Sequence, residues 1–343
     1  MYFMSELGFG IIGCGGIAPT HAGAIGKVPG ARLVAVCDIV PERAQALGEK
    51  FECEWYPDYD QMLSRPEVAV VNVCTPSGLH AEHAMHAIRA GKHVITEKPI
   101  DISLKRIDRL IAEAEKARVK LACIFQYRFN DTSRRIKREI EEGRLGKIIF
   151  ANASVKWFRK QSYYDSGEWR GTWALDGGVL SNQAIHSIDQ LTWFMGDFER
   201  VEWAQIETRE REIEAEDWGF AVVRYANGVA ASVQASTLAW PGYSAQVEVY
   251  GTKGSAVVAD GGDLVSYRIE GEEEVQQAAK EGPNVSSDPL ANPLTGHAAE
   301  IEDFVQAIRE DREPFVTGQE ARKAVQVLTE IYRKALGYNP FER

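Results

Sequence analysis

The strongest constraint on the fold is a regular alternation of apolar segments and amphipathic helical segments over residues 7–126. Apolar strands separated by helices are typical of βαβ units, which build a parallel sheet with helices on both faces. The near-continuous apolar run Ala69–Cys74 is of the kind that such a sheet buries on both sides. The pattern predicts a doubly wound α/β domain over residues 1–126, with strands at Leu7–Gly13, Arg32–Asp38, Ala69–Cys74, His93–Glu97 and Leu121–Gln126 and helices at Ile17–Lys27, Glu42–Phe51, Ala81–Ala90 and Leu104–Arg118.

Residues 127–343 instead carry long stretches of alternating apolar and polar residues, with a hairpin signal at Asn227-Gly228. Such alternation is typical of a mostly antiparallel sheet that packs one face against helices. A chain of 343 residues is also too long to fold around a single hydrophobic core, which favours two domains. We therefore predict an α+β domain over residues 127–343, with strands within Lys147–Phe158, Val201–Thr208, Trp218–Leu238 and Gln246–Ile269, helices at Thr132–Gly143, His297–Arg309 and Gln319–Leu336, and a loop at Gly282–Gly296.

Charge and composition restrict the function classes. The formal net charge is −11 and no long basic run is present, which argues against a nucleic-acid partner because a phosphate backbone selects for a basic face. No apolar run approaches the ~20 residues that span a bilayer, and the N-terminus lacks a signal-peptide pattern. The five cysteines form no C-x-x-C pair and are typical of reduced thiols. We therefore predict a cytoplasmic protein with a small-molecule substrate and no membrane or nucleic-acid partner.

A glycine-rich turn, Gly13-Cys14-Gly15-Gly16-Ile17-Ala18, follows the first predicted strand and matches G-x-G-x-x-A at the opening of a helix. The first glycine permits the tight turn, and the second lets the backbone approach a pyrophosphate at the helix N-terminus. The alanine keeps the helix close to the strand. Many strands are followed by glycine-rich turns, but in this βαβ context the motif predicts a dinucleotide-binding Rossmann domain that binds its cofactor through Gly13, Gly15, Gly16, Ile17 and Ala18.

Asp38 ends the second predicted strand, twenty residues after Ala18. An acid at this place accepts hydrogen bonds from the adenosine ribose and repels a 2′-phosphate. We therefore expect NAD as the cofactor and favour NADP less, although Arg43 lies close enough in the sequence to soften this preference. The alternative role of Asp38 is to cap the turn that follows the strand.

Thr75-Pro76 follows the buried apolar strand at its carboxyl end, where open α/β sheets bind ligands, so both residues are candidates to line the nicotinamide side. The nearby His80, His83 and His86 have the composition of a metal cluster. Helix positions six apart point about 120° apart, however, so the three side chains cannot share one ion. We predict no metal site and expect His80 to support the cofactor site.

Glu97-Lys98-Pro99 lies at the exit of another buried strand, again at the carboxyl edge. Pro99 ends the strand, and Lys98 then lies where a substrate hydroxyl would meet the nicotinamide. A partly buried lysine can donate or accept a proton near neutral pH. Lys98 is therefore a candidate for proton transfer and for cofactor and substrate contacts, and Glu97 for cofactor contacts. The alternative is a surface Glu–Lys pair at a strand end.

A second group of polar residues lies in segment 176–189, where Asn182 and His186 are four residues apart and would share one face of a helix. A histidine titrates near neutral pH, which suits it to remove a hydroxyl proton while a hydride acceptor oxidises the alcohol. Asp189, one turn further on, is a candidate to orient the imidazole. A purely structural, hydrogen-bonded Asn–His pair is the alternative.

Together these motifs resemble the Gfo/Idh/MocA oxidoreductase family, the relatives of glucose-fructose oxidoreductase and inositol 2-dehydrogenase. The resemblance covers nearly the whole chain. It implies that Lys98 and His186 handle the proton with Asn182 beside them, and that a homodimer or homotetramer forms through an open face of the C-terminal sheet. It rests on the glycine-rich turn, Asp38, Thr75-Pro76-x-x-x-His80, Glu97-Lys98-Pro99 and G-G-x-L-x-N-x-x-x-His186.

One position departs from the common family pattern, because many members have Asp four residues before the histidine and this chain has Asn182. Asn binds a hydroxyl but cannot take its proton, so the base role falls on His186 or Lys98. The stretch 163–183 resembles members that oxidise UDP-linked N-acetylglucosaminuronic acid at C3. Residues 126–129 are closer to generic members, so the sequence leaves the nucleotide linkage open.

The sequence is compatible with three functions. The first is an NAD(H)-dependent dehydrogenase for a secondary hydroxyl of a sugar, sugar acid or cyclitol, and the second is a nucleotide-sugar 3-dehydrogenase. The third is an NAD-dependent glycosidase or a non-catalytic NAD-binding regulator. Arg170 can hold a carboxylate, and aromatic side chains suit the C–H faces of a pyranose. The predicted substrate-binding residues are Lys98, Tyr127, Arg128, Trp169, Arg170, Asn182 and His186.

Overall fold

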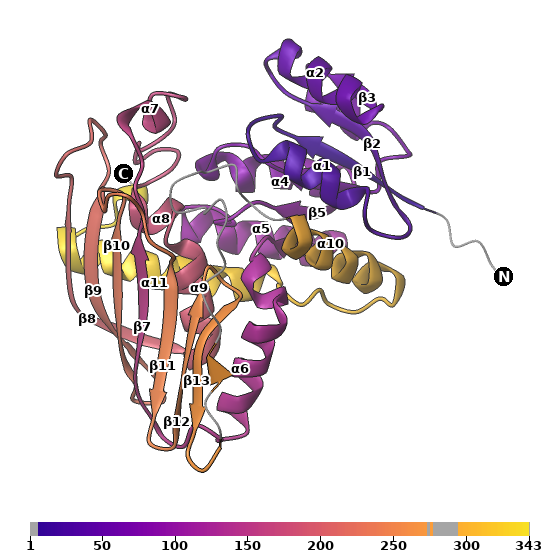
Figure 1. The fold of residues 1–343 in the computed structure, drawn as a ribbon. Helices are drawn as coiled ribbons and strands as arrows, with labels where there is room; N and C mark the ends of the chain where they lie inside the picture. The colour runs from indigo at the N-terminus through magenta and orange to yellow at the C-terminus, as the bar shows by residue number, and fades with distance from the viewer. Residues whose placement is uncertain (1–5, 273–274, 277–293, 343) are drawn as a thin grey trace. The chain divides into compact units, whose positions relative to one another are not determined.

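The computed structural model describes residues 6–272, 275–276 and 294–342, and the chain divides into two compact units (Figure 1). The first unit comprises Met1–Gln126 and Asn292–Arg322, and the second comprises Tyr127–Ala291 and Lys323–Arg343. The division after residue 126 coincides with the predicted domain boundary. Residues 292–322 differ from that prediction because they belong to the first unit. Most of the predicted loop at 282–296 lies outside the described residues.

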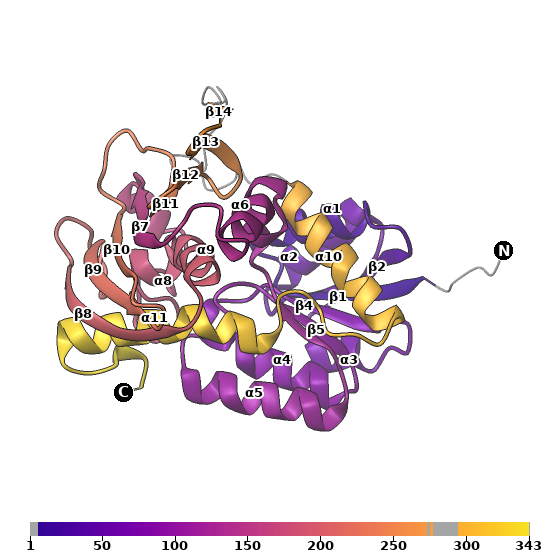
Figure 2. The same cartoon turned by 90° about the horizontal axis from the view of Figure 1, so that it is seen from below.

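The first unit is built on a six-stranded parallel sheet with helices on both faces. Its strands are β1 (Leu7–Ile12), β2 (Ala31–Cys37), β3 (Glu54–Tyr56), β4 (Val70–Val73), β5 (His93–Thr96) and β6 (Leu121–Cys123), in the order β3-β2-β1-β4-β5-β6. Its helices are α1 (Ala18–Ile25), α2 (Pro41–Phe51), α3 (Tyr59–Leu63), α4 (His80–Arg89), α5 (Leu104–Ala117) and α10 (Leu294–Arg309). Figure 2 shows α4 and α5 on one face of the sheet and α1 and α10 on the other. The predicted doubly wound fold is confirmed.

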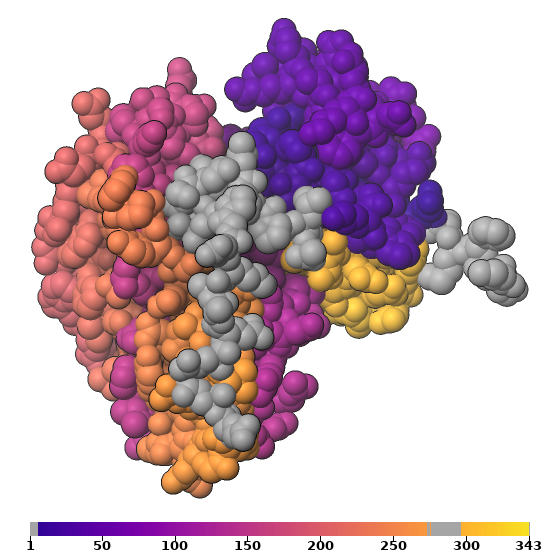
Figure 3. Space-filling view, in the orientation of Figure 1, coloured from indigo at the N-terminus to yellow at the C-terminus, as the bar shows by residue number. Residues whose placement is uncertain are grey.

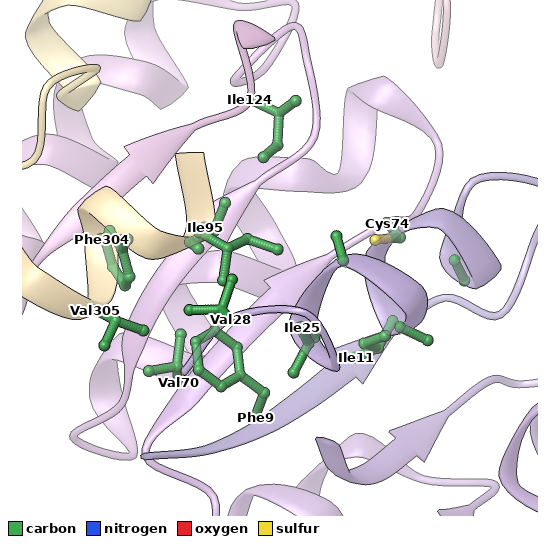
Figure 4. Packing of buried hydrophobic residues seen from close by; sticks show 14 of the residues in the cluster. Phe9, Ile11, Ile25, Val28, Val70, Cys74, Ile95, Ile124, Phe304 and Val305 are labelled. Carbon is green, nitrogen blue, oxygen red and sulfur yellow. The ribbon is translucent and has the colours of Figure 1, made fainter. Parts of the chain in front are cut away.

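A hydrophobic core between the sheet, α1 and α10 explains why the late segment belongs to this unit (Figure 4). Phe9 and Ile95 of the sheet pack with Ile25 of α1, and Phe304 and Val305 of α10 close the cluster. All five side chains are fully buried. Burying one such side chain contributes about 1.5–3 kcal/mol, so the helix is bound firmly to the sheet. In the space-filling view the yellow side chains of α10 pack directly against the indigo N-terminal residues (Figure 3).

The second unit is built on an eight-stranded, mostly antiparallel sheet, as predicted. Its order is β14-β13-β12-β11-β7-β10-β9-β8, and within the described part of this sheet only β7 and β10 pair in parallel. The strands are β7 (Ile148–Lys156), β8 (Phe198–Glu207), β9 (Trp218–Tyr225), β10 (Ala230–Ser236), β11 (Gln246–Gly251), β12 (Gly254–Ala259), β13 (Asp263–Ile269) and β14 (Val275–Gln276). The helices are α6 (Asp131–Glu141), α7 (Gln161–Tyr164), α8 (Val179–Asn182), α9 (Ile185–Met195) and α11 (Gly318–Leu336), the last beginning in the first unit.

The two faces of this sheet differ. In β10, Ala231, Val233 and Ala235 are buried, and α8 and α9 lie over that side of the sheet (Figure 1). The alternate residues of the same strand are half-buried. The predicted hairpin turn joins β9 to β10 at Asn227-Gly228, where Gly228 has a φ of +85°. Among the described helices none is long and apolar enough to cross a membrane.

Candidate active site

The glycine-rich turn between β1 and α1 has the geometry that a dinucleotide needs. Gly13 has a φ of +95°, and a Cβ there would lie 2.7 Å from the carbonyl oxygen of Cys74, so only glycine fits. At Gly15 and Gly16 an added Cβ would meet no described atom within 4 Å. The turn therefore presents bare backbone and open space at the start of α1, where Ile17 is the N-cap and the fully buried Ala18 packs against the core. These features fit a pyrophosphate group.

Asp38 follows β2 and lies directly beside this turn. Its Oδ2 accepts the N–H of Cys14 at 2.7 Å, and its Oδ1 accepts the N–H of Val40 at 2.8 Å. Each carboxylate oxygen keeps a further lone pair with which it can accept a ribose hydroxyl. The capping role and the cofactor role of Asp38 are therefore compatible. Arg43, in the first turn of α2, is exposed.

We expect Asp38→Ala to weaken NADH binding about 10-fold or more, because hydrogen bonds to a charged group contribute about 1.5–3 kcal/mol each. The variant also loses the cap on the Cys14 amide. Fluorescence titration of NADH measures the change. Asp58→Ala is the matched control, since it removes the acid that caps α3 and should leave the NADH affinity unchanged. Equal affinities of wild type and Asp38→Ala would contradict the assignment.

His80 ties together two loops at the carboxyl edge of β4 and β5. Its Nε2 lies 2.8 Å from the carbonyl oxygen of Thr75, and its Nδ1 lies 2.7 Å from that of Pro99. Burial lowers the pKa of His80, and the two carbonyl oxygens oppose that lowering because they only accept hydrogen bonds. The ring fixes the half-exposed Thr75-Pro76 turn relative to the segment that carries Lys98. These contacts are compatible with the predicted supporting role of His80, which stays a prediction.

Glu97 is buried beneath Lys98, with only 6% of its surface exposed. Its Oε1 lies 2.8 Å from His21 Nε2, and its Oε2 accepts the backbone N–H of Lys98 at 3.0 Å. Burial alone would raise the pKa of Glu97, but hydrogen bonds from His21 and His297 hold it well below the usual range. The Lys98 side chain itself is half-exposed. The predicted cofactor contact of Glu97 stays a prediction, because these bonds of its carboxylate are made to residues of the protein itself.

His21, Glu97 and His297 bring metal-type donor atoms within 4.8 Å of one another. The 2.8 Å between His21 Nε2 and Glu97 Oε1 is a hydrogen bond, however, and the other nitrogen of His21 lies 2.7 Å from Asn72 Nδ2. We therefore interpret the group as a hydrogen-bonded network. Sequence reasoning missed both histidines, although His21 lies one turn after Ala18 on the buried face of α1.

In the second unit, His186 lies on the first turn of α9 and is 8% exposed. The ring of Tyr127 packs on it, with centroids 5.0 Å apart. Arg128, the next residue, donates two hydrogen bonds to Asp189, from Nε to Oδ2 at 2.9 Å and from Nη2 to Oδ1 at 2.7 Å. Asp189, which the sequence assigned to the imidazole, is thus held in a buried, bidentate pair with Arg128. That pair anchors the Tyr127 segment to the helix of His186.

Asn182 and His186 lie on two consecutive short helices, so the prediction of one shared helix is wrong. α8 ends at Asn182 and α9 begins at Ile185. Between them the N–H of Ala184 bonds to the carbonyl of Val179 at 2.8 Å, a five-residue spacing that breaks the helical register. The amide of Asn182 is oriented by Asp176, whose Oδ1 accepts its Nδ2–H at 2.6 Å.

Arg170 lies over two aromatic rings, with its guanidinium 4.3 Å from the ring centre of Tyr163 and 4.5 Å from that of Trp169. Its Nη1 also donates to the Tyr163 hydroxyl at 2.7 Å. Arg159 is 3% exposed, and its guanidinium lies 5.6 Å from the same Tyr163 ring. Burial raises the pKa of Tyr163, so its hydroxyl is neutral. The guanidinium of Arg170 is a group that can pair with an anionic ligand group.

Glu216 is a buried carboxyl group that sequence reasoning missed. Its Oε1 accepts the N–H of Leu180 at 2.9 Å and the hydroxyl of Tyr332 at 2.8 Å, and its backbone carbonyl accepts the N–H of Val179. It therefore fixes the start of α8, the helix that ends at Asn182. Burial raises the pKa of Glu216 to about 7, although the hydrogen bonds from Leu180 and Tyr332 oppose this rise.

We expect Glu216→Gln to stabilise the protein at pH 8.5 and to change its stability much less at pH 5. The pKa of Glu216 is raised on folding, so its contribution to stability is full below the unfolded pKa near 4.5 and is lost as the pH rises through about 7. Glutamine stays neutral and removes up to about 3 kcal/mol of this loss. Thermal unfolding at both pH values measures the change in stability, and Glu168→Gln, at an exposed position, is the control. An equal effect at both pH values would contradict the shifted pKa.

Two family models match the chain. Residues 7–125 match the oxidoreductase family with an NAD-binding Rossmann fold, and residues 133–257 match the GFO/IDH/MocA C-terminal domain. The matches cover the parallel sheet with its glycine-rich turn and most of the second sheet. The Rossmann match supports NAD as the cofactor for the turn and Asp38.

The chain is also similar to individual dehydrogenases over most of its length. The WlbA dehydrogenase from Bordetella pertussis, solved with NADH and UDP-GlcNAcA, is 33% identical with a TM-score of 0.85, and the similarity covers 96% of each chain. An inositol 2-dehydrogenase from Rhizobium meliloti is 27% identical over 92% of this chain and 93% of its own length. A myo-inositol 2-dehydrogenase from Thermotoga maritima is 26% identical over 92% of both. The motifs, the fold and these matches agree: the chain belongs to the GFO/IDH/MocA oxidoreductase family and is an NAD-binding oxidoreductase.

Proposed function

We propose that this protein is an NAD-dependent dehydrogenase that oxidises a secondary hydroxyl of an acidic sugar, with a nucleotide-linked uronic acid of the UDP-GlcNAcA type as the first candidate. The observation that carries the proposal is the guanidinium of Arg170, which lies over the rings of Tyr163 and Trp169, with the buried Arg159 near the same Tyr163 ring. A carboxylate is the sugar substituent that such a group recognises best. The similarity to the WlbA dehydrogenase solved with UDP-GlcNAcA supports the nucleotide linkage.

The proton chemistry falls to two side chains of this protein. NAD, when bound at the glycine-rich turn, supplies the hydride acceptor. His186 takes the hydroxyl proton as the alcohol becomes a ketone, because an imidazole titrates near the working pH. The ammonium group of Lys98 favours the developing alkoxide. Asn182, oriented by Asp176, holds a neighbouring hydroxyl and cannot act as the base.

The proposal also includes a homo-oligomeric assembly and a cytoplasmic location. The face of the eight-stranded sheet opposite α8 and α9 carries aromatic side chains. Phe150 stacks on Tyr250, and Trp203 packs on Phe220. Phe150 and Trp203 are 44% and 46% exposed, which supports a homodimer or homotetramer formed through this face. The five cysteines are free thiols, which supports a cytoplasmic location.

The test is NADH formation, followed by absorbance, with UDP-GlcNAcA, UDP-GlcNAc, unlinked N-acetylglucosaminuronic acid and myo-inositol. We expect turnover of UDP-GlcNAcA and much slower turnover of UDP-GlcNAc, which lacks the carboxylate. Arg170→Met should remove this discrimination, whereas Arg138→Met, on the exposed side of α6, should not. Turnover of myo-inositol alone would overturn the acidic-sugar proposal, and cleavage of a glycoside without net NADH formation would overturn the dehydrogenase.

A further inference from the structure

We propose that His21 and His297 act through Glu97 as positioning residues for Lys98. The role of Lys98 in turnover rests on the proposed function. The positioning of Lys98 by the network does not, because it depends only on contacts within the first unit. The network joins four elements of that unit: α1 carries His21, β4 carries Asn72, β5 leads into Glu97, and α10 carries His297.

The carboxylate of Glu97 holds the chain at Lys98 from below. The backbone N–H of Glu97 bonds to the carbonyl of Val73 at 2.8 Å, which continues the pairing of β5 with β4. Its side chain then folds back so that Oε2 accepts the N–H of Lys98 at 3.0 Å. The backbone of Lys98 is thereby fixed relative to the sheet edge. A shift of the carboxylate would move the start of the lysine side chain.

His21 sets the orientation of that carboxylate. It is fully buried, and its Nε2–H points to Oε1 of Glu97 at 2.8 Å. Asn72 Nδ2, 2.7 Å from Nδ1 of the same ring, donates to it and leaves the proton on Nε2. The helix that carries His21 begins at the glycine-rich turn. The network therefore connects the cofactor turn to Lys98 through side chains.

His297 completes the network from a distant part of the sequence. Its Nε2 lies 3.6 Å from the same Glu97 oxygen, and its ring lies edge-on to that of His21 with centroids 5.4 Å apart. It is 1% exposed, and α10 is fixed to the sheet by Phe304 and Val305. Nothing in the glycine-rich turn or the Glu97-Lys98-Pro99 motif requires a second buried histidine here. A role in holding the carboxylate explains it.

The charges of the network favour the ammonium form of Lys98. Glu97 is ionised, and burial lowers the pKa of His297, which keeps that ring neutral. Asp101 lies three residues after Lys98 and is paired with Arg106, and His80 of α4 contacts the carbonyl oxygen of Pro99. The network thus places one fixed negative charge against the backbone of Lys98, and an opposite charge near the lysine favours its ammonium form.

The experiment measures Lys98 directly and does not depend on knowing the substrate. Competitive acetylation across a range of pH, read at the Lys98 peptide by mass spectrometry, gives the lysine pKa in the intact protein. We expect Glu97→Gln to lower that pKa by about one unit or more. His297→Leu should shift it in the same direction, and His297→Gln, which keeps a donor, should restore most of it. His93→Gln is the matched control, because His93 lies on the same strand and accepts the N–H of Lys120 at 2.9 Å.

Turnover provides the second readout. Once a substrate is found, Glu97→Gln and His297→Leu should lower kcat about 10–100-fold with little change in KM, the pattern of a displaced catalytic group. An unchanged Lys98 pKa in both variants would overturn the inference even if sugars are oxidised. A shifted pKa without turnover of any sugar would uphold it and remove the proposed function. Stoichiometric zinc that binds to wild type and not to His297→Leu would make the cluster a metal site and overturn the network.

Discussion

We expect His186→Asn to lower kcat about 10²–10⁴-fold, the usual contribution of a positioned general base. Asparagine keeps a hydrogen-bonding group beneath Tyr127 but cannot take up a proton. NADH affinity should stay close to that of wild type, because the predicted cofactor groups lie in the other unit of the chain. Steady-state kinetics with the best substrate of the panel, together with NADH titration, measure both quantities.

Lys98→Met extends this test, because it removes the charge and keeps the aliphatic stem. If Lys98 and His186 serve the same proton transfer, the double variant should lose little more than the worse single variant. The control is His93→Asn, a histidine on β5 that accepts the backbone N–H of Lys120 at 2.9 Å. Near wild-type turnover in both single variants would remove these two residues from the mechanism.

The parts of the site that could be predicted are those whose residues belong to short sequence motifs. The glycine-rich turn, Asp38 and Lys98 each follow a buried strand, and the carboxyl ends of parallel strands meet at one edge of the sheet. Strand periodicity and local turn chemistry were therefore enough to place them. The antiparallel sheet followed from alternation, although Gln246–Ile269 is divided into three strands by turns that the alternation does not mark.

The parts that could not be predicted depend on contacts between distant segments. His297 meets Glu97 across 200 residues of sequence, and Glu216 reaches Tyr332 across 116. No local pattern pairs them. Asp189 was assigned to His186 because it lies one helical turn away. The fold also brings Arg128 to this carboxylate in a bidentate pair, which the local spacing did not predict.

The buried pair of Arg128 and Asp189 should have the largest effect on stability. Both side chains are almost fully buried, so Arg128→Met removes the guanidinium that neutralises the Asp189 carboxylate in a low dielectric. Breaking such a pair from one side costs about 3–5 kcal/mol, and thermal or urea unfolding would show it. Turnover should fall as well, because Tyr127, which packs on His186, is the residue before Arg128 and would shift with its backbone.

The double variant Arg128→Met/Asp189→Leu separates charge from packing. Apolar side chains of similar volume replace a buried ion pair at little cost, so the double variant should recover most of the stability that Arg128→Met loses. The control is the bidentate pair of Arg322 with Asp108, which is partly exposed, and Arg322→Met should cost far less because solvent screens it. If the double variant is as unstable as the single one, the pair stabilises the fold through its geometry, and the unpaired charge does not account for the loss.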